Sequence, residues 1–370
     1  MTSKAKVQNK DDLSLAYTPG VAEPCRKIFE DKNKAYDYTW KGNSVAVVTD
    51  GTAVLGLGDI GPEAALPVME GKALLFKEFA GIDAVPICLD TKDPKEIIQI
   101  VKAIAPTFGG INLEDISAPR CVEIERALIE ELDIPVFHDD QHGTAVVVTA
   151  ALINALKLVK KEPHELKVVI SGTGAAGSAI IHMLIDLGVK NIIAFNKDGA
   201  LNEAMTTATF VEKEILALIT PKDFTGTMAD AFVGADVFVG VSAPNLVTKE
   251  MVASMNEGNI VFPMANPEPE ITYQEALAGG AAVVGTGRSD FPNQINNVLA
   301  FPGLFRGAFA AEATTITPAM QLACAYAIAD SIPYSELNSD YIIPSAFDEN
   351  VVDLITMKVA EAAREDGVTR

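Results

Sequence analysis

Residues 167–188 read KVVISGTGAAGSAIIHMLIDLG and carry the strongest fold signal in the chain. An apolar run leads into the spacing GxGxxG, and a helix-length apolar stretch follows. This order is typical of the strand, turn and helix that hold a dinucleotide, with the pyrophosphate at the amides of the first helical turn. We therefore predict a helix that begins near Gly174 and a cofactor-binding turn made of Gly172, Thr173, Gly174, Ala175, Ala176 and Gly177.

The same glycine spacing occurs earlier, in GLGDIG at residues 56–61. Pro62 follows directly and suits the first turn of a helix, so that helix is expected to start near Gly61, too late to hold a pyrophosphate. Asp59 would also put a carboxylate where phosphate charge has to sit. We expect this loop to line the substrate side of a cleft, and contact with the nicotinamide end of the cofactor stays open.

The strand expected after the glycine turn, NIIAFN, ends in Asn196. Dinucleotide folds usually carry Asp or Glu at this position, where it binds the adenosine ribose. Asn196 can also bind a ribose hydroxyl, but without a carboxylate a 2′-phosphate is not repelled. This strand end therefore leaves the choice between NAD and NADP open; NAD is the expected cofactor, with NADP possible.

Strand-like apolar runs alternate with helix-length stretches on both sides of residue 160. This alternation predicts parallel sheets built from βαβ units. We predict an α/β protein of two domains. They are an N-terminal catalytic domain (residues 1–160) and a Rossmann-type, doubly wound dinucleotide-binding domain (residues 161–370), whose C-terminal helices pack back on the first domain.

The formal net charge of −21 disfavours nucleic acid and acidic membranes as partners. The polar N-terminus lacks the apolar core of a signal peptide, and no stretch suggests a membrane span, so a cytoplasmic protein is expected. A small anionic substrate would need local cations or a bound metal to offset the negative field.

Acidic pairs follow two expected strands: Glu114 and Asp115 in INLEDISAP, and Asp139 and Asp140 in IPVFHDDQHG. Strand ends meet at one edge of a parallel sheet, so these carboxylates could form an oxygen site for Mg²⁺ or Mn²⁺. Helix caps or solvated turns are the simpler alternative. His138 and His142 are expected in a loop and not in a zinc site.

Two further side chains are candidates for acid–base chemistry. Lys72 lies in a mainly apolar helical stretch, EGKALLF, where burial would lower its pKa enough to make it a base. The alternative is a lysine whose ammonium group reaches solvent. Tyr17 precedes a Pro-Gly turn that could hold its phenol rigidly, or it is an exposed turn residue.

Taken together, AYTPGVAEPC, AVLGLGDIG, FGGINLEDISAPRC, IPVFHDDQHGTA, SGTGAAG, MANPEPEI and FPNQINNVLAFPG resemble, in order and over almost the whole chain, the short bacterial form of the malic enzymes. The resemblance implies oxidative decarboxylation of L-malate to pyruvate and CO₂, with reduction of NAD or NADP and a requirement for Mg²⁺ or Mn²⁺. It also implies at least a homodimer.

The resemblance assigns roles residue by residue. Lys72 and Tyr17 match the catalytic lysine and tyrosine, and Glu114, Asp115 and Asp140 match the metal ligands. Asn266 falls at the substrate and nicotinamide end of the site. Asn297 falls there too, as a substrate-binding residue, with Asn296 its close competitor.

Alternatives stay open at this point. In a malolactic reaction NAD would be retained and lactate released, with nearly the same motifs. A non-catalytic nucleotide-binding protein on this scaffold would be expected to lack some of these residues. The cation that meets the second malate carboxylate is Arg26, Arg120 or neither.

Overall fold

The computed structural model describes residues 6–54 and 56–370. Within them, the first half of the chain forms a parallel sheet in the order β2-β1-β3-β4. Its central strand SVAVVT is wholly buried, as expected for a parallel sheet covered on both faces. The strands are β1 (Ser44–Thr49), β2 (Asp83–Cys88), β3 (Gly110–Leu113) and β4 (Val136–His138).

Three long helices connect these strands: α4 (Pro62–Ala80), α5 (Pro94–Ile104) and α6 (Arg120–Glu131). Helix α4 begins where the sequence predicted, with Gly61 as its N-cap and Pro62 in its first turn. Gly61 has a φ of +83°, a left-handed value that glycine adopts without strain. The helix therefore starts after the GLGDIG loop and carries Lys72 into the interior.

The second half forms a sheet in the order β10-β9-β8-β5-β6-β7. It is parallel except for β7, which pairs antiparallel with β6. All five strands predicted here are present, and only the two-residue β7 was missed. The strands are β5 (Lys167–Ser171), β6 (Asn191–Asn196), β7 (Gly199–Ala200), β8 (Val237–Gly240), β9 (Ile260–Pro263) and β10 (Val283–Val284). The helices are α8 (Ala175–Asp186), α9 (Phe210–Leu218), α10 (Met228–Phe232), α11 (Lys249–Ala253) and α12 (Tyr273–Ala278).

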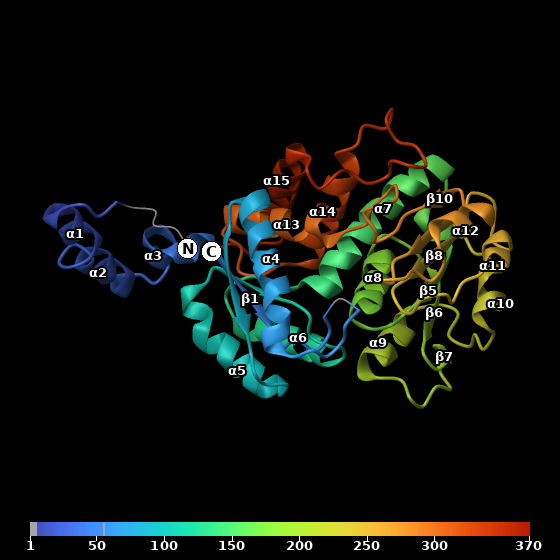
Figure 1. Cartoon of the computed structure of the whole chain (residues 1–370), viewed down its shortest axis with the longest axis horizontal. Helices are drawn as coiled ribbons and strands as arrows, with labels where there is room; N and C mark the ends of the chain where they lie inside the picture. The colour runs from blue at the N-terminus through green and yellow to red at the C-terminus, as the bar shows by residue number, and fades with distance from the viewer. Residues whose placement is uncertain (1–5, 55) are drawn as a thin grey trace.

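Helix α7 (Thr144–Val159) runs through the middle of the molecule between the two sheets (Figure 1). Together with the turn before it, Asp139–Val159 has the length and apolar character of a membrane span, but 72% of its most apolar window is buried inside the protein. A helix that forms the core of a globular protein has the same length and apolar character and is covered in the same way.

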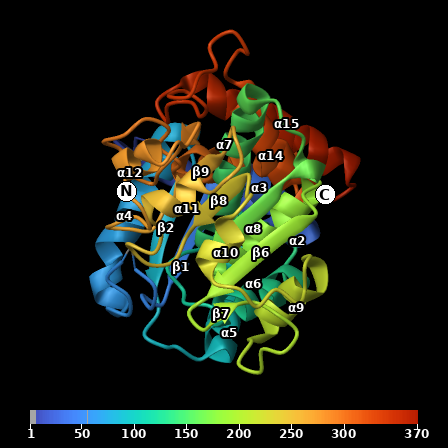
Figure 2. The same ribbon diagram turned by 90° about the vertical axis from the view of Figure 1, so that its right-hand side faces the viewer.

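The C-terminal helices pack back as predicted. Helix α13 (Phe301–Ala310) contacts α4, and α14 (Pro318–Asp330) contacts α7. Helix α15 (Glu349–Glu365) packs across both α13 and α14. Figure 2 shows α14 and α15 above strands β6 and β8 of the second sheet. The last part of the chain thus completes the core around α4 and α7.

The N-terminal helices form an arm: α1 (Lys10–Ala16), α2 (Ala22–Glu30) and α3 (Lys34–Tyr38). In the described chain none of their residues is buried. Figure 1 shows α1 and α2 standing away from the rest of the molecule. The large apolar side chains of Leu13, Leu15 and Phe29 on α1 and α2 are exposed within one chain.

Candidate active site

Two acidic pairs meet at the carboxyl ends of β3 and β4, which are neighbours in the first sheet. Glu114, Asp115 and Asp140 bring one carboxylate oxygen each within 4.8 Å of one another. Asp115 has a left-handed φ of +52°, and its backbone amide donates to Oδ2 of Asp140 at 2.7 Å. The predicted grouping of these three residues is present.

The cluster suits a divalent cation. Glu114 and Asp115 are buried, and Oδ2 of Asp115 has no hydrogen-bond partner among the described residues. Burial, and then the charge of neighbouring carboxylates, raises the pKa of Asp115. Buried carboxylates without partners are costly unless a cation or a proton neutralises them. Three hard oxygen donors fit Mg²⁺ or Mn²⁺, which would be held by these side chains.

Lys72 lies beside this cluster and is 7% exposed. Its Nζ is 2.5 Å from Oδ2 of Asp139 and 3.0 Å from Oε1 of Glu114, and it sits 4.1 Å from the ring centre of Phe301. Burial lowers the pKa of Lys72, but the charges of Asp139 and Glu114 outweigh burial, so the pKa is raised. The predicted lowering of the lysine pKa is therefore wrong for the protein alone.

Asp139 is a member of this site that the sequence named in an acidic pair with Asp140 but gave no role of its own. It is fully buried, and its Oδ2 accepts from Lys72 and also from Nδ2 of Asn297 at 2.5 Å. Asn296 instead turns its side chain to the amide of Val298, which it caps. Of the two competing asparagines, Asn297 thus joins the lysine cluster. The adjacent acids in the motif FHDDQHG were the signal for Asp139.

Residues Asp139–Gly143 form a π-helical turn that continues into α7, where the sequence predicted a loop. The backbone amide of Thr144 donates to the carbonyl groups of Asp139 and Gln141, so the turn is part of the helix. His138 lies in the preceding strand and His142 in the turn. The two histidines therefore do not share a helical face.

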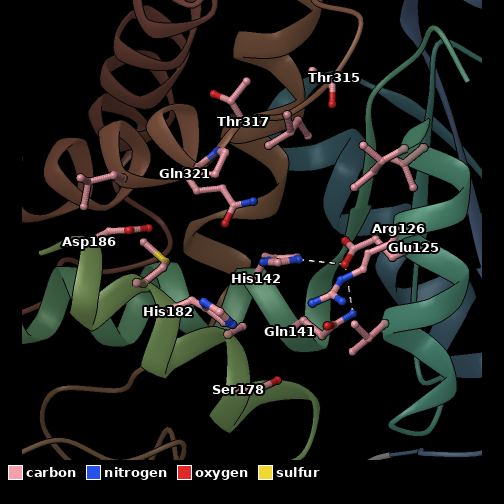
Figure 3. A pocket seen from close by; sticks show the side chains of 18 of the residues that line it. Glu125, Arg126, Gln141, His142, Ser178, His182, Asp186, Thr315, Thr317 and Gln321 are labelled. Carbon is pink, nitrogen blue, oxygen red and sulfur yellow. Dashed lines mark hydrogen bonds and ion pairs between the residues drawn. The ribbon is translucent and has the colours of Figure 1, made fainter. Parts of the chain in front are cut away.

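Glu125 on α6 holds this turn from behind and is 3% exposed. It accepts hydrogen bonds from the amide of His138 at 2.8 Å, from Nε2 of Gln141 at 3.2 Å and from the ring of His142 at 2.9 Å. Figure 3 shows His142 and Gln141 pointing toward Glu125. All three residues line a cavity of about 590 Å³ between α6, α8 and the start of α14. Sequence reasoning missed Glu125, because nothing in RCVEIERAL marks one glutamate as buried.

The glycine turn of the second domain has the predicted geometry. Helix α8 starts at Ala175, directly after Gly174. Gly172 has a φ of +105°, and a Cβ on Gly177 would come within 1.8 Å of the carbonyl oxygen of Gly172. A Cβ on Gly174 would meet open space. The turn therefore leaves room at the amino end of α8, where a pyrophosphate would be held.

A cavity of about 670 Å³ lies next to this turn. Thr173, Gly174 and Asn196, three of the residues predicted to bind the cofactor, line it. Glu212 of α9 lines it too and was not predicted. Its signal was the capping pattern TFVE, in which Thr209 caps the helix and Glu212 is the third helical residue.

The GLGDIG loop lies against the second domain. A Cβ on Gly56, whose φ is +70°, would come within 3.0 Å of the carbonyl oxygen of Asn266. Asn266 follows β9, and its side chain lies near Gly287. The loop before the Lys72 helix thus meets the segment predicted to hold the nicotinamide end.

Tyr17 is not part of this cluster within one chain. It ends α1 in the N-terminal arm, is 66% exposed and makes no side-chain hydrogen bond in the described residues. Arg26 is also in the arm, where it pairs with Glu23. Arg120 is near the site and is held by Asp50 at 2.9 Å.

Family models divide the chain into two matches. Residues 1–129 match the N-terminal domain of malic enzyme, and residues 141–365 match the NAD binding domain of malic enzyme. The chain belongs to the malic enzyme family. This assignment agrees with the resemblance on which the sequence motifs were matched.

Similar malic enzymes cover the whole chain. A bifunctional malic/malolactic enzyme of Bacillus subtilis is 57% identical over 369 residues, which are 100% of this chain and 90% of the relative. An NAD-dependent malic enzyme of Geobacillus stearothermophilus is 59% identical over 368 residues, 100% of this chain and 77% of the relative. The crystal structure of malic enzyme from Pyrococcus horikoshii is 48% identical, with a TM-score of 0.96 over 100% of this chain and 87% of that one.

Membership in this family confirms the predicted fold and reaction class. The protein is an oxidoreductase that decarboxylates malate and carries an NAD-binding domain. A non-catalytic protein on the same scaffold is thereby set aside.

Proposed function

We propose that the protein oxidises L-malate with net release of reduced coenzyme, pyruvate and CO₂, and that Lys72 is its base. The observation that supports this most is the position of Lys72. Its buried ammonium lies 3.0 Å from Glu114, one of the three clustered carboxylates. Substrate bound to a metal ion that these carboxylates would hold would place its C2 hydroxyl beside the lysine.

In this proposal Glu114, Asp115 and Asp140 would hold Mg²⁺ or Mn²⁺, which would supply Lewis-acid stabilisation of negative charge on the C2 oxygen, and a bound nicotinamide would supply the hydride acceptor. Lys72 takes the proton from the C2 hydroxyl. Asp139 orients the lysine, and Asn297 holds Asp139. A divalent cation would offset the carboxylate charge that raises the lysine pKa and so favour the neutral amine.

Two further assignments are part of this proposal. Asn266 lies at the nicotinamide and substrate end, since its backbone meets the loop before the Lys72 helix. The glycine turn from Gly172 to Gly177 holds the pyrophosphate. The domain division stays at residues 160 and 161, between the last strand of the first sheet and the start of the second. A cytoplasmic location stays an expectation.

The test is turnover of malate with NAD and Mn²⁺, following NADH, pyruvate and lactate together. We expect NADH and pyruvate in equal amounts. Lys72→Ala should lower kcat by about a thousandfold or more, as for loss of a positioned acid–base group. NAD affinity, measured by calorimetry, should stay nearly the same. Near-normal kcat in this variant would remove Lys72 from the mechanism.

A malolactic reaction is the second candidate, because a relative with 57% identity is named a bifunctional malic/malolactic enzyme. In that reaction the coenzyme would stay bound and return its hydride, so lactate would form without net NADH. The same assay separates the two reactions. Lactate in an amount equal to the malate consumed would show the malolactic reaction in place of the one we propose.

We further propose that the protein is a homodimer in which Tyr17 acts in the active site of the partner. The arm that carries Tyr17 exposes several large apolar side chains, and Phe29 is 92% exposed. An uncovered apolar surface of this kind favours association with another copy. A tyrosine delivered in this way would supply the proton to C3 of enolpyruvate, relayed through Lys72.

Mixed dimers test this arrangement. Tyr17→Phe and Lys72→Ala protomers are each expected to be nearly inactive. If Tyr17 acts on the partner's site, a mixed dimer has one site with both Lys72 and Tyr17 intact. Random mixing should then restore about a quarter of wild-type activity. Light scattering gives the oligomeric state, and a mixture with no restored activity, despite proven exchange, would show that Tyr17 does not act across the dimer.

A further inference from the structure

Glu212 contacts the two segments beside which the adenosine ribose of a dinucleotide is expected. Its Oε1 accepts from the hydroxyl of Thr173 at 2.6 Å and from Nδ2 of Asn196 at 2.9 Å. Its Oε2 accepts from the amide of Thr209 at 2.8 Å. Thr173 belongs to the glycine turn and Asn196 ends the second Rossmann strand. The carboxylate that such folds usually carry at that strand end thus comes from α9.

Glu212 is 6% exposed and is held in its ionised form. Burial raises the pKa of Glu212, but the hydrogen bonds from Thr173, Thr209 and Asn196 outweigh burial and lower it. Each oxygen of an ionised carboxylate has two lone-pair sites, so Glu212 can accept a further hydrogen bond from a ligand hydroxyl. It lines the cavity beside the turn, so a ligand there meets its charge.

The charge of this cavity is unfavourable for a phosphate at the ribose. Among the described residues that line it, Lys197 is the one cation, while Asp198 and Glu212 are both carboxylates. Lys197 and Asp198 are exposed, so solvent and salt screen their charges. Glu212 is the buried charge of the three, and its field on a neighbouring anion is screened less.

We propose that Glu212 makes this protein select NAD over NADP, by accepting the 2′-hydroxyl of the adenosine ribose and repelling a 2′-phosphate. This inference rests on the proposed binding of the pyrophosphate at the glycine turn. Asn196 then acts as a positioning residue, because its amide fixes the carboxylate and leaves the ribose to Glu212. The sequence left the coenzyme open because it showed only Asn196 at the strand end.

The test is calorimetric binding to the protein without malate or metal. The ligands are NAD, NADP and two fragments, adenosine 5′-monophosphate and adenosine 2′,5′-bisphosphate. Glu212→Gln removes the charge, keeps the size and keeps the helix cap, since glutamine also serves at this capping position. Glu203→Gln is the matched control, because it removes the same charge from an exposed residue that does not line the cavity.

Wild-type protein should bind NAD at least about tenfold more tightly than NADP, and it should bind the monophosphate more tightly than the bisphosphate. A difference of about tenfold lies between the interaction of two unit charges in bulk water and the larger interaction near a protein surface. Glu212→Gln should reduce this preference by about tenfold, mainly by tightening NADP, while Glu203→Gln should leave it unchanged.

Equal affinities of the wild type for NAD and NADP would overturn the inference, and so would an unchanged preference in a folded Glu212→Gln variant. If that variant does not fold, the inference can still be overturned with the wild type, by equal affinities for the monophosphate and the bisphosphate. Wild-type protein that binds none of the four ligands would instead overturn the proposed coenzyme site, so the two failures are distinguishable.

Discussion

The neighbours Asp139 and Asp140 should respond differently to the same change. Asp139 accepts two short hydrogen bonds, from Lys72 and Asn297, whereas Asp140 belongs to the group of three clustered carboxylates. Asp139→Asn replaces one acceptor oxygen by a donor and removes the charge. A hydrogen bond to a charged group contributes about 1.5–3 kcal/mol. If the loss applies in the transition state, kcat falls about 10- to 150-fold.

The concentration of Mn²⁺ at half-maximal rate separates the two residues. Asp139→Asn should leave it close to the wild-type value, since this side chain is not among the proposed ligands. Asp140→Asn should raise it by about 10- to 100-fold, at least the size seen for residues that support metal ligands. Direct Mn²⁺ binding, followed by electron paramagnetic resonance, checks this without turnover. The reasoning is refuted if Asp139→Asn retains wild-type kcat, or if both variants weaken Mn²⁺ equally.

Three further predictions concern the supporting structure. Gly177→Ala should lower the free energy of unfolding, measured by urea titration, by about 1–3 kcal/mol through overpacking in the glycine turn. Gly174→Ala, whose Cβ meets open space, should leave the free energy of unfolding within about 0.5 kcal/mol of the wild-type value. Asn297→Ala should lower kcat about tenfold or more, because Asp139 loses a hydrogen bond. Asn296→Ala should mainly lower the free energy of unfolding, by about 1 kcal/mol, because a cap is lost. Equal kcat in the two variants would contradict the assignment of Asn297 to the active site. Glu125→Ala should lower the free energy of unfolding by about 3 kcal/mol, because three donors lose their acceptor in the interior, and an unchanged unfolding midpoint would count against this role.

Local sequence signals predicted most of the fold because they act over short distances along the chain. The spacing in SGTGAAG requires a turn in which Gly177 approaches Gly172 closely, and Pro62 requires a helix start near Gly61. Apolar runs such as SVAVVT predict buried parallel strands from composition alone. The carboxylates after β3 and β4 were predicted to meet because strand ends share one edge of a sheet.

The features that the sequence did not predict depend on contacts between distant segments. Asp139 differs from Asp140 only in which neighbours its side chain meets, namely Lys72 from α4 and Asn297 from the far end of the chain. The pKa of Lys72 was predicted to fall from burial alone. It is raised because Asp139 and Glu114, from two other elements, bring their charges to it.

The sequence by itself therefore determined the two α/β units, the glycine turn and the residue types of the active site, since periodicity and turn chemistry are local properties. Only the tertiary structure decided that Glu125 is buried behind the turn Asp139–Gly143 and that Glu212 supplies the carboxylate beside Asn196. It also decided that Tyr17, at the end of α1, lies outside the site of its own chain. Charge and hydrogen bonding depend on distance in space, and for these residues that distance is set by packing between segments far apart in sequence.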